Sequence, residues 1–195
     1  MARNTDPTKL EKIKKAAMDL VVKYGYRGTS IGAIAKKAGV SIGYLYRHYS
    51  GKSDLIQDLI DYNFKVFEEL FLQIENERDT IKENIYDIIK MLFDMAIKYP
   101  IKAKFLCALI FDQNFELKKR RENEEKIRKF GNDVLRKGLE NGEVNPKTSL
   151  QEIMLVIFAI TFNYISINLS EDYTKEKFGE KQARRVTEIC LNALQ

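Results

Sequence analysis

The stretch that decides the fold runs from residue 29 to residue 55 and reads TSIGAIAKKAGVSIGYLYRHYSGKSDL. Thr29 or Ser30 can cap a helix, and the apolar residues that follow recur at helical spacing: Ile31, Ile34, Ala35 and Ala38. Gly39 stands where a left-handed C-terminal cap belongs, and Ser41 can cap a second helix. Two short helices joined by a glycine-containing turn are typical of a helix-turn-helix.

The second helix can be oriented from its periodicity. If Leu45 points into the core, about 100° per residue puts Tyr49 about 40° and Ile42 about 60° from the core direction. Gly43 and Arg47 then lie roughly opposite Leu45. The sequence therefore predicts an outward face centred on Gly43 and Arg47.

The residues of this outward face are of types that can contact the bases and phosphates of double-stranded DNA. Gly43 lets the backbone come close to DNA, and Arg47 can donate two hydrogen bonds to guanine. Tyr44 and Tyr46 flank them and offer hydroxyls to phosphate. Lys52 and the amide groups at the start of the next helix can bind a phosphate, with Ser50 as the cap of that helix. A solvent-exposed face in an ordinary all-α protein is the alternative interpretation of the same residues.

A family resemblance favours DNA binding. The run IAKKAGVS at residues 34–41, followed by Gly43, Leu45, Tyr46, His48, Tyr49, Lys52 and Leu55, resembles the N-terminal domain of tetracycline-repressor-type (TetR family) transcription factors. By position, the resemblance implies DNA contacts at Thr29, Ser41, Ile42, Gly43, Tyr44, Tyr46, Arg47, His48 and Lys52. Ile42 and Arg47 lie at positions that vary in such proteins, so the operator sequence is not implied.

Composition predicts an all-α protein. The 195 residues are 45% hydrophobic and 31% charged, and only three are proline, which leaves long helical stretches uninterrupted. We expect about nine helices in two domains. A three-helix helix-turn-helix domain occupies residues 1–52, with a disordered arm at residues 1–8, and a larger helical domain for ligand binding and dimerisation occupies residues 53–195.

The excess of positive over negative charge is confined to the N-terminal part. Residues 1–55 contain 11 lysines and arginines against 4 acidic residues, whereas the remainder has a net charge of −2. An excess of positive charge beside the helix-turn-helix is what phosphate neutralisation requires.

The larger domain contains one helix without charges. Thr80 with Glu83 and Ser149 with Glu152 form capping-box patterns at two helix starts. From Ile153 to Ser170 no charged residue occurs, a length that borders on a membrane span. The polar residues within the run and the lack of flanking basic clusters favour a helix buried between the core and a second subunit.

The resemblance implies a homodimer and a pocket for a small-molecule effector. We expect the dimer interface to include Ile157, Tyr164, Ile165, Val186, Ile189 and Ala193. Aromatic and aliphatic residues can line a pocket for a largely apolar effector: Phe67, Phe71, Phe93, Phe105, Leu109, Phe111, Phe115, Phe130, Phe158 and Phe162. The same residues at helical spacing are also compatible with ordinary core packing.

The sequence predicts a regulator rather than an enzyme. It has one histidine, no cysteine pairs at metal spacing and no glycine-rich phosphate loop after a strand, so we expect no catalytic residue, metal or cofactor. Cys107 and Cys190 are expected to be reduced, buried thiols. No signal peptide precedes the first helix, which predicts a cytoplasmic protein. The partners implied are a double-stranded DNA operator, bound as a palindrome, and an effector, with no membrane. The alternative is a helical protein-interaction or membrane-associated module without a DNA role.

Overall fold

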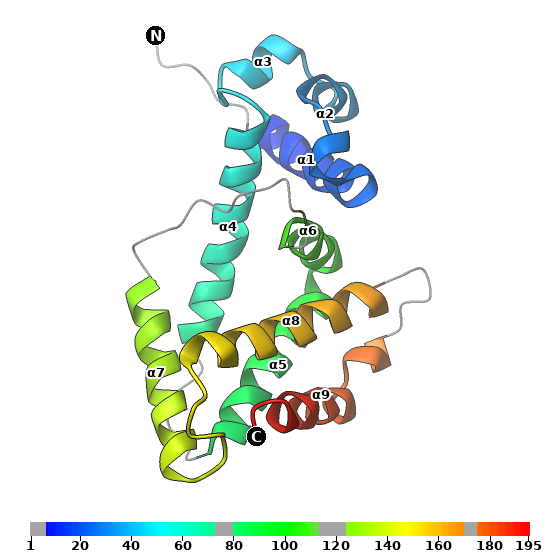
Figure 1. Cartoon of the computed structure of the whole chain (residues 1–195). Helices are drawn as coiled ribbons and strands as arrows, with labels where there is room; N and C mark the ends of the chain where they lie inside the picture. Colours follow the sequence, from blue (N-terminus) through cyan, green and yellow to red (C-terminus); the bar gives the residue numbers. More distant parts are fainter. Residues whose placement is uncertain (1–6, 73–79, 111, 113–123, 170–174) are drawn as a thin grey trace. The chain divides into compact units, whose positions relative to one another are not determined.

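The computed structural model describes residues 7–72, 80–110, 112, 124–169 and 175–195 (Figure 1). Every regular element in these ranges is helical, which confirms the predicted all-α class. The helices are α1 (Pro7–Gly28), α2 (Ile31–Ala38), α3 (Ile42–Tyr46), α4 (Lys52–Leu72), α5 (Ile81–Lys98), α6 (Pro100–Ile110), α7 (Glu124–Glu140), α8 (Leu150–Asn168), the 3₁₀ helix η1 (Lys175–Phe178) and α9 (Glu180–Asn192).

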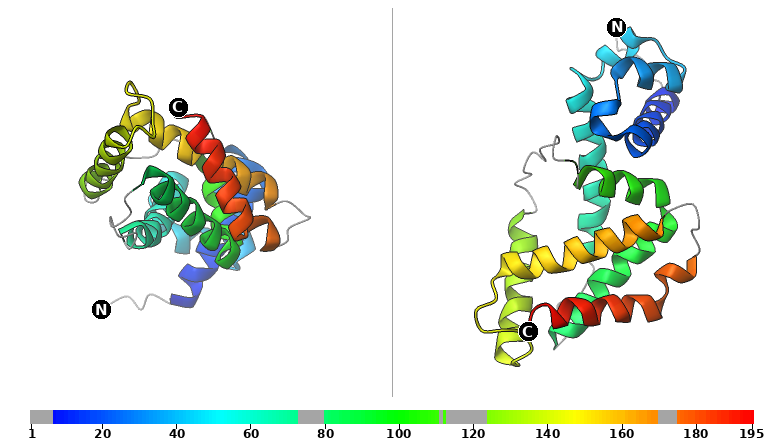
Figure 2. Two further views of the ribbon diagram at one scale, coloured as in Figure 1. Left: turned by 90° about the horizontal axis from the view of Figure 1, so that it is seen from below. Right: turned by 45° about the vertical axis from the view of Figure 1, so that its right-hand side comes forward.

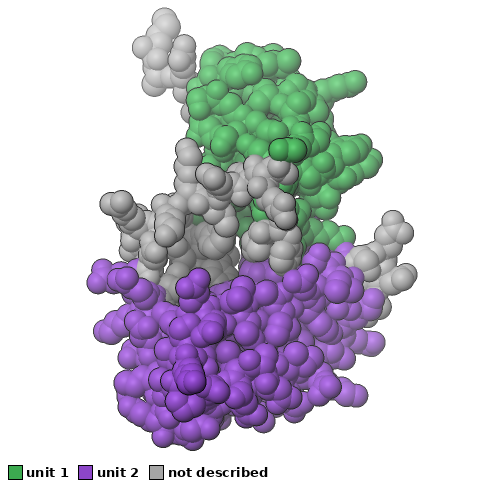
Figure 3. Space-filling view, viewed as in Figure 1, with its two compact units in different colours: residues 1–65, 104–118 green, residues 66–103, 119–195 purple. Residues whose placement is uncertain are grey.

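The chain forms two compact units (Figure 3). The first combines residues 1–65 with residues 104–118, and the second combines residues 66–103 with residues 119–195. The division therefore falls inside α4, after residue 65, whereas the sequence places a domain boundary after residue 52. The first unit also includes a later segment of the chain, which no local sequence pattern indicates. Most of the expected arm at residues 1–8 lies outside the described residues.

In the first unit α2 packs against both α1 and α3. Helix α1 runs to Gly28, but Gly25 interrupts it with φ 70° and ψ 174°, a backbone conformation that glycine adopts without a steric penalty. The buried apolar side chains of α1 to α4 form the core: Ile13, Ala16, Ala17, Val21, Ile34, Ala35, Ala38, Leu45, Leu55, Ile56, Leu59 and Ile60.

In the second unit α5 packs against α7, α8, α9 and η1 (Figure 2). Its apolar face is buried along its full length because apolar residues recur at three- and four-residue spacing. An aromatic cluster fixes one side of α5: the ring centroid of Phe93 lies 5.2 Å from those of Tyr164 on α8 and Phe178 on η1. Helix α5 is therefore the common packing partner in this unit.

The predicted helix starts are confirmed. At α5 the Thr80 hydroxyl accepts the Glu83 amide at 3.2 Å, and at α8 the Ser149 hydroxyl accepts the Glu152 amide at 3.2 Å. In α8 the Glu152 carboxylate also accepts the Ser149 amide at 2.7 Å, which completes a reciprocal capping box. These bonds satisfy amides that have no partner within the helix.

Helix α8 is long and apolar enough to cross a membrane by length and composition, and 28% of its most apolar window is buried. Its described side chains divide between two environments. Ile153, Ile157 and Ile165 are buried, whereas Leu155 is 65% and Ile167 is 71% exposed. Part of its apolar surface therefore lies outside the core of the chain.

Candidate nucleic-acid interface

Helices α2 and α3 are joined by the turn that the sequence predicts. Ser30 caps α2 by accepting the Ala33 amide at 3.1 Å, so the cap is Ser30 rather than Thr29. Gly39 ends α2 with φ 67° and ψ 35°, and Ser41 caps α3 by accepting the Tyr44 amide at 3.1 Å. Because the left-handed conformation costs a residue with a side chain about 1–2 kcal/mol, glycine is needed at this corner.

Helix α3 is held by its inward side. Leu45 is fully buried, and Tyr49, just after the helix, is 9% exposed, both as predicted. The Tyr49 hydroxyl donates to the Asp58 carboxylate at 2.9 Å, and Lys14 lies 3.3 Å from the same carboxylate. Burial and then Asp58 raise the pKa of Tyr49 well above its ordinary value, so its hydroxyl stays a donor. The inward side of α3 is thus fixed by both packing and a part-buried hydrogen bond.

The outward side of α3 is open, as the periodicity predicts. Gly43, Arg47 and His48 are exposed, and Tyr46 and Ile42 are 58% and 49% exposed. A Cβ atom added at Gly43 would meet nothing within 4 Å, and its φ is not positive. The fold itself therefore does not require glycine at this position. An approaching backbone or duplex would be the reason for its small size.

Tyr44 differs from the expectation. Its hydroxyl is buried within the subunit and has no hydrogen-bond partner among the described residues, so it does not face a phosphate in this conformation. Its ring instead contacts three neighbours: the Arg47 guanidinium at 4.9 Å from the ring centroid, the Lys9 ammonium at 5.6 Å and the His48 ring at 4.9 Å. The contacts of this side chain are therefore made by its ring and not by its hydroxyl.

Two predicted DNA contacts, Thr29 and Lys52, make internal hydrogen bonds. Thr29 is 2% exposed, and its hydroxyl donates to the Gly25 carbonyl at 2.9 Å. The Lys52 ammonium donates to the Tyr26 carbonyl at 2.8 Å and lies 4.1 Å from the Tyr26 ring centroid. Both side chains therefore stabilise the break in α1 near Gly25, and their contacts with DNA remain predictions.

Asp112, which follows α6, belongs to the same cluster within the first unit. Its carboxylate accepts the Tyr26 amide at 3.2 Å. Burial lowers the pKa of Lys52, and the nearby Asp112 carboxylate opposes that shift. The sequence analysis missed Asp112, because its partner Tyr26 is 86 residues away along the chain. No local pattern could have indicated this contact.

The described members of the expected effector pocket lie in both units. Phe105 and Leu109 are buried in the first unit, and Phe93, Phe130 and Phe162 are buried in the second. The rings of Phe158 and Phe162 stack with centroids 6.0 Å apart. The side chains of Phe67 and Phe71, and all of Phe111 and Phe115, lie outside the described residues. Whether these residues share one pocket stays a prediction.

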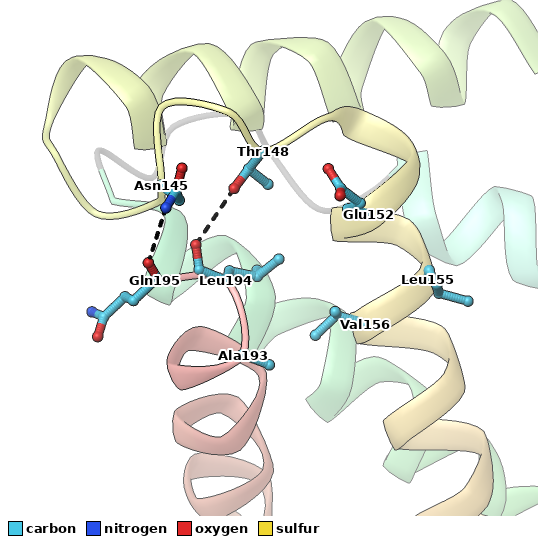
Figure 4. Close-up of a pocket in the computed structure, with 8 residues that line it drawn as sticks. All are labelled: Asn145, Thr148, Glu152, Leu155, Val156, Ala193, Leu194 and Gln195. Carbon is cyan, nitrogen blue, oxygen red and sulfur yellow. Dashed lines mark hydrogen bonds between the residues drawn. The ribbon is translucent and has the colours of Figure 1, made fainter.

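A pocket of about 340 Å³ opens in the second unit between the start of α8 and the end of α9 (Figure 4). The Asn145 side chain donates to the Gln195 carbonyl, and the Thr148 hydroxyl donates to the Leu194 carbonyl, so the two chain segments are tied together there. None of the expected pocket residues lines it. The lining residues are Asn145, Thr148, Glu152, Leu155, Val156, Ala193, Leu194 and Gln195.

The residues expected at a dimer interface fall into two groups. Ile157, Ile165 and Val186 are at most 1% exposed, and Tyr164 stacks on Phe93 and donates its hydroxyl to the Lys177 carbonyl at 3.0 Å. Ile157, Ile165 and Val186 therefore pack inside the subunit, and Tyr164 is half-buried. Their place in a dimer interface stays a prediction. The other two expected residues, Ile189 and Ala193, are exposed. Leu155 and Ile167 on α8 are also exposed, although they were not expected at the interface. Helix α8 has no charge after Glu152, so it has no polar face to show which side points outward.

Within the described residues, no group of three or more histidine, cysteine or acidic side chains lies close enough to hold a metal ion. Cys107 and Cys190 are buried thiols outside any disulfide, and burial raises the pKa of each to about 12. Both thiols therefore stay protonated at neutral pH.

Comparison with known sequences identifies relatives of part of the chain. The family model described as bacterial regulatory proteins of the tetR family matches residues 13–59. An HTH-type transcriptional regulator of Staphylococcus aureus (strain USA300) is 31% identical over 108 residues, which are 55% of this chain and 56% of that protein. The counterpart in the bovine strain RF122 is 30% identical over the same length. The match thus spans only about half the length of these relatives.

Solved structures resemble the whole fold. The fatty acid degradation regulator FadR of Bacillus halodurans matches with a TM-score of 0.70 at 21% identity, over 99% of each chain. The Bacillus subtilis regulator FadR, in complex with stearoyl-CoA, matches with a TM-score of 0.68 at 21% identity, over 95% of this chain and 99% of its own. The ketosteroid regulator KstR2 of Mycobacterium tuberculosis matches with a TM-score of 0.66 at 18% identity, over 98% and 96%. At these identities the likeness establishes the fold.

Proposed function

We propose that this chain, which belongs to the tetR family of bacterial regulatory proteins, is a cytoplasmic transcriptional repressor that binds a palindromic operator as a homodimer. A small, largely apolar effector releases it from DNA. The observation that carries the DNA-binding role is the open face of α3, with Gly43 and Arg47 exposed and Leu45 buried on the other side.

The physical case for DNA binding is one of shape and charge. Gly43 leaves the α3 backbone bare, and Arg47 is exposed beside it, so a groove edge can approach the helix closely. The net positive charge of residues 1–55 supplies phosphate contacts, each of which releases counterions from DNA. Base contacts through Arg47 then provide sequence preference, and phosphate contacts fix the position of the protein.

The homodimer is supported by the exposed apolar side chains of α8 and α9. Leu155 and Ile167 stay largely in water in the single chain, and Ile189 on the neighbouring α9 is 42% exposed. A second copy would cover them, and a two-fold axis would present two α3 helices to a palindrome. Leu155 also lines the pocket in Figure 4, so we assign that pocket to the dimer surface rather than to the effector.

A membrane-associated module is the second candidate, because α8 has the length and apolarity of a membrane span. The two candidates differ in what covers Leu155 and Ile167. Sedimentation of the purified chain would give a dimer under the first, and flotation with vesicles of anionic and neutral phospholipid would recover the chain under the second. A dimer that does not float with vesicles excludes the membrane candidate.

Effector release is supported by the fold and by the apolar interior of the second unit. The Bacillus subtilis neighbour was solved with stearoyl-CoA. In our proposal the effector binds best to a conformation in which α4 has moved and the two α3 helices no longer match their half-sites. A ligand shifts this equilibrium only to the extent that it binds one state more tightly.

Selection of bound sequences from a random duplex library tests the proposal. We expect a palindromic consensus, with log affinity that falls steeply with log salt concentration. Arg47→Ala should weaken binding to the selected duplex more than to a scrambled one, whereas Lys52→Ala should weaken both. A thermal melt of each variant is the control, because Lys52 also bonds Tyr26. Failure to select any sequence would reject the DNA-binding role.

Titration with stearoyl-CoA then tests the effector class. We expect the affinity for the selected duplex to fall as stearoyl-CoA is added, while free coenzyme A at the same concentration has no effect. If neither stearoyl-CoA nor other apolar ligands ever change the affinity, the effector part of the proposal fails and DNA binding stands.

A further inference from the structure

The ring of Tyr44 contacts two cationic side chains that are far apart in the sequence. Arg47 follows α3, and Lys9 belongs to the first turns of α1, yet both charged groups lie within 6 Å of one ring centroid. Both side chains are exposed. The negative π faces of the ring attract both cations, which opposes the repulsion between their like charges.

The hydroxyl of Tyr44 cannot explain the arrangement. It is buried and has no partner among the described residues. Burying a hydroxyl without a hydrogen bond costs free energy, so this orientation persists only if the contacts of the ring offset that cost. The His48 ring also contacts the Tyr44 ring, with the two ring planes at 52° to each other.

We propose that Tyr44 is a positioning residue, whose ring holds the Arg47 guanidinium toward a base edge and the Lys9 ammonium toward a phosphate. The inference rests on the proposed DNA-binding function and adds two assignments to it. Lys9 becomes a DNA contact that sequence reasoning did not identify. Tyr44 acts on DNA through these cations and not through its own hydroxyl.

The physical advantage is preorganisation. A free arginine side chain loses about 2 kcal/mol of rotamer entropy when it is fixed on DNA. A guanidinium that already lies against a ring has lost part of that freedom before binding, so less rotamer entropy is lost when the complex forms. The same holds for Lys9, whose position on α1 is fixed by the helix itself.

Three variants separate the ring from the hydroxyl. Tyr44→Phe keeps the ring and removes the buried hydroxyl, so we expect affinity for the duplex selected by the wild type to stay within about twofold. Tyr44→Leu removes the ring, and we expect a loss of about 3- to 10-fold. The matched control is Tyr24→Leu, which removes a ring beneath Lys23 (5.0 Å) away from α3 and should leave affinity unchanged.

Base preference gives a measurement that a merely structural role would not change. Repeated selection with Tyr44→Leu should broaden the consensus at the base positions that Arg47→Ala also broadens, and nowhere else. The double variant should bind little more weakly than Arg47→Ala alone, because the ring acts through Arg47. Fully additive losses, or an unchanged consensus with Tyr44→Leu, would overturn the positioning role.

Lys9 is tested separately by the salt dependence of binding. Lys9→Met should reduce the slope of log affinity against log salt by about one phosphate contact, on both selected and scrambled duplexes. An unchanged slope would overturn the Lys9 assignment. Circular dichroism melts accompany every variant, and if Tyr44→Leu does not fold, Tyr44→Met takes its place. If the wild type selects no duplex, the proposed function fails; if it does and these variants match it, only this inference fails.

Discussion

Helices α3 and α8 expose opposite chemistries. Helix α3 has five residues and one fully buried side chain, Leu45, and it exposes Gly43, Tyr46 and, just beyond its end, Arg47. Helix α8 has 19 residues and no charge after Glu152, and it exposes Leu155 and Ile167. One helix keeps a cationic and aromatic surface in water, and the other keeps an aliphatic one there.

The difference indicates what each surface binds. An exposed arginine is well solvated, so the α3 surface can stay in contact with water in the free protein until a polar partner binds. An exposed leucine or isoleucine forgoes about 1.5–3 kcal/mol of burial, so the α8 surface gains most from a permanent apolar partner. The two helices therefore fit a reversible DNA contact and a lasting contact with a second copy.

The largest effect should come from the inward side of α3. Leu45→Ala should destabilise the protein by about 2–5 kcal/mol, since Leu45 is fully buried and its removal leaves a cavity. Leu155→Ala is the matched substitution at a residue that is 65% exposed, and it should change the unfolding free energy far less at concentrations where the chain is monomeric. Urea denaturation measures both. Equal losses would contradict the contrast between the two helices.

A second test removes the apolar character of the α8 surface. The double variant Leu155→Lys with Ile167→Lys should raise the dimer dissociation constant at least about tenfold, because each lysine would be buried without a partner. Sedimentation equilibrium measures the constant, and affinity for a palindromic duplex should fall with it. Substitution of Ser166, also exposed on α8, by lysine is the control for added charge. Unchanged association in the double variant would rule this surface out as the interface.

Two glycines of the helix-turn-helix should respond in opposite directions. Gly39→Ala forces an alanine to φ 67° and should destabilise the fold by about 1–2 kcal/mol. Gly43→Ala meets no neighbour and should stabilise α3 by about 0.5–1 kcal/mol, yet weaken binding to the selected duplex. Thermal melts and duplex titrations of both variants separate fold from function. A Gly43→Ala variant with unchanged affinity would mean that DNA does not approach α3 closely there.

The smallest expected effect concerns the caps at the starts of α8 and α3. Ser149 donates its amide and hydroxyl to Glu152 and lowers the pKa of that carboxylate below its ordinary value of 4.5. A lowered pKa in the folded state means that this stabilisation is present above pH 4.5 and is lost as pH falls through the folded value. The first turn of α3 contains no acidic residue, so its Ser41 cap should not titrate there.

Glu152→Gln should therefore flatten the pH dependence of stability slightly. The midpoint of thermal unfolding is compared between wild type and variant at neutral pH and below the ordinary pKa. The difference between the two unfolding midpoints should become smaller as the pH falls. A constant gap would show that the capping box does not depend on the charge of Glu152.

The sequence predicted which side of α3 points outward, but it did not predict the contacts that the side chains around α3 make. Leu45 inward and Arg47 outward follow from helical periodicity, and the structure confirms both. The other contacts join residues that are far apart in the sequence. They are the contact of the Tyr44 ring with Lys9, the Lys52 bond to the Tyr26 carbonyl and the Asp112 bond to the Tyr26 amide. Side-chain reach alone does not select among the partners that the packed helices bring close.

The sequence by itself determined the helical class, the caps at Ser41 and Ser149 and the left-handed turn at Gly39, whereas it left Thr29 and Ser30 as alternative caps of α2. Each of these depends on bonds between residues three or four apart, which the chain order fixes before any packing occurs. Only the tertiary structure decided which side of α8 is buried. That helix has no polar face after its first turn, so its rotation is set by the shapes it packs against on α5, α7 and α9, and those shapes exist only once the helices meet.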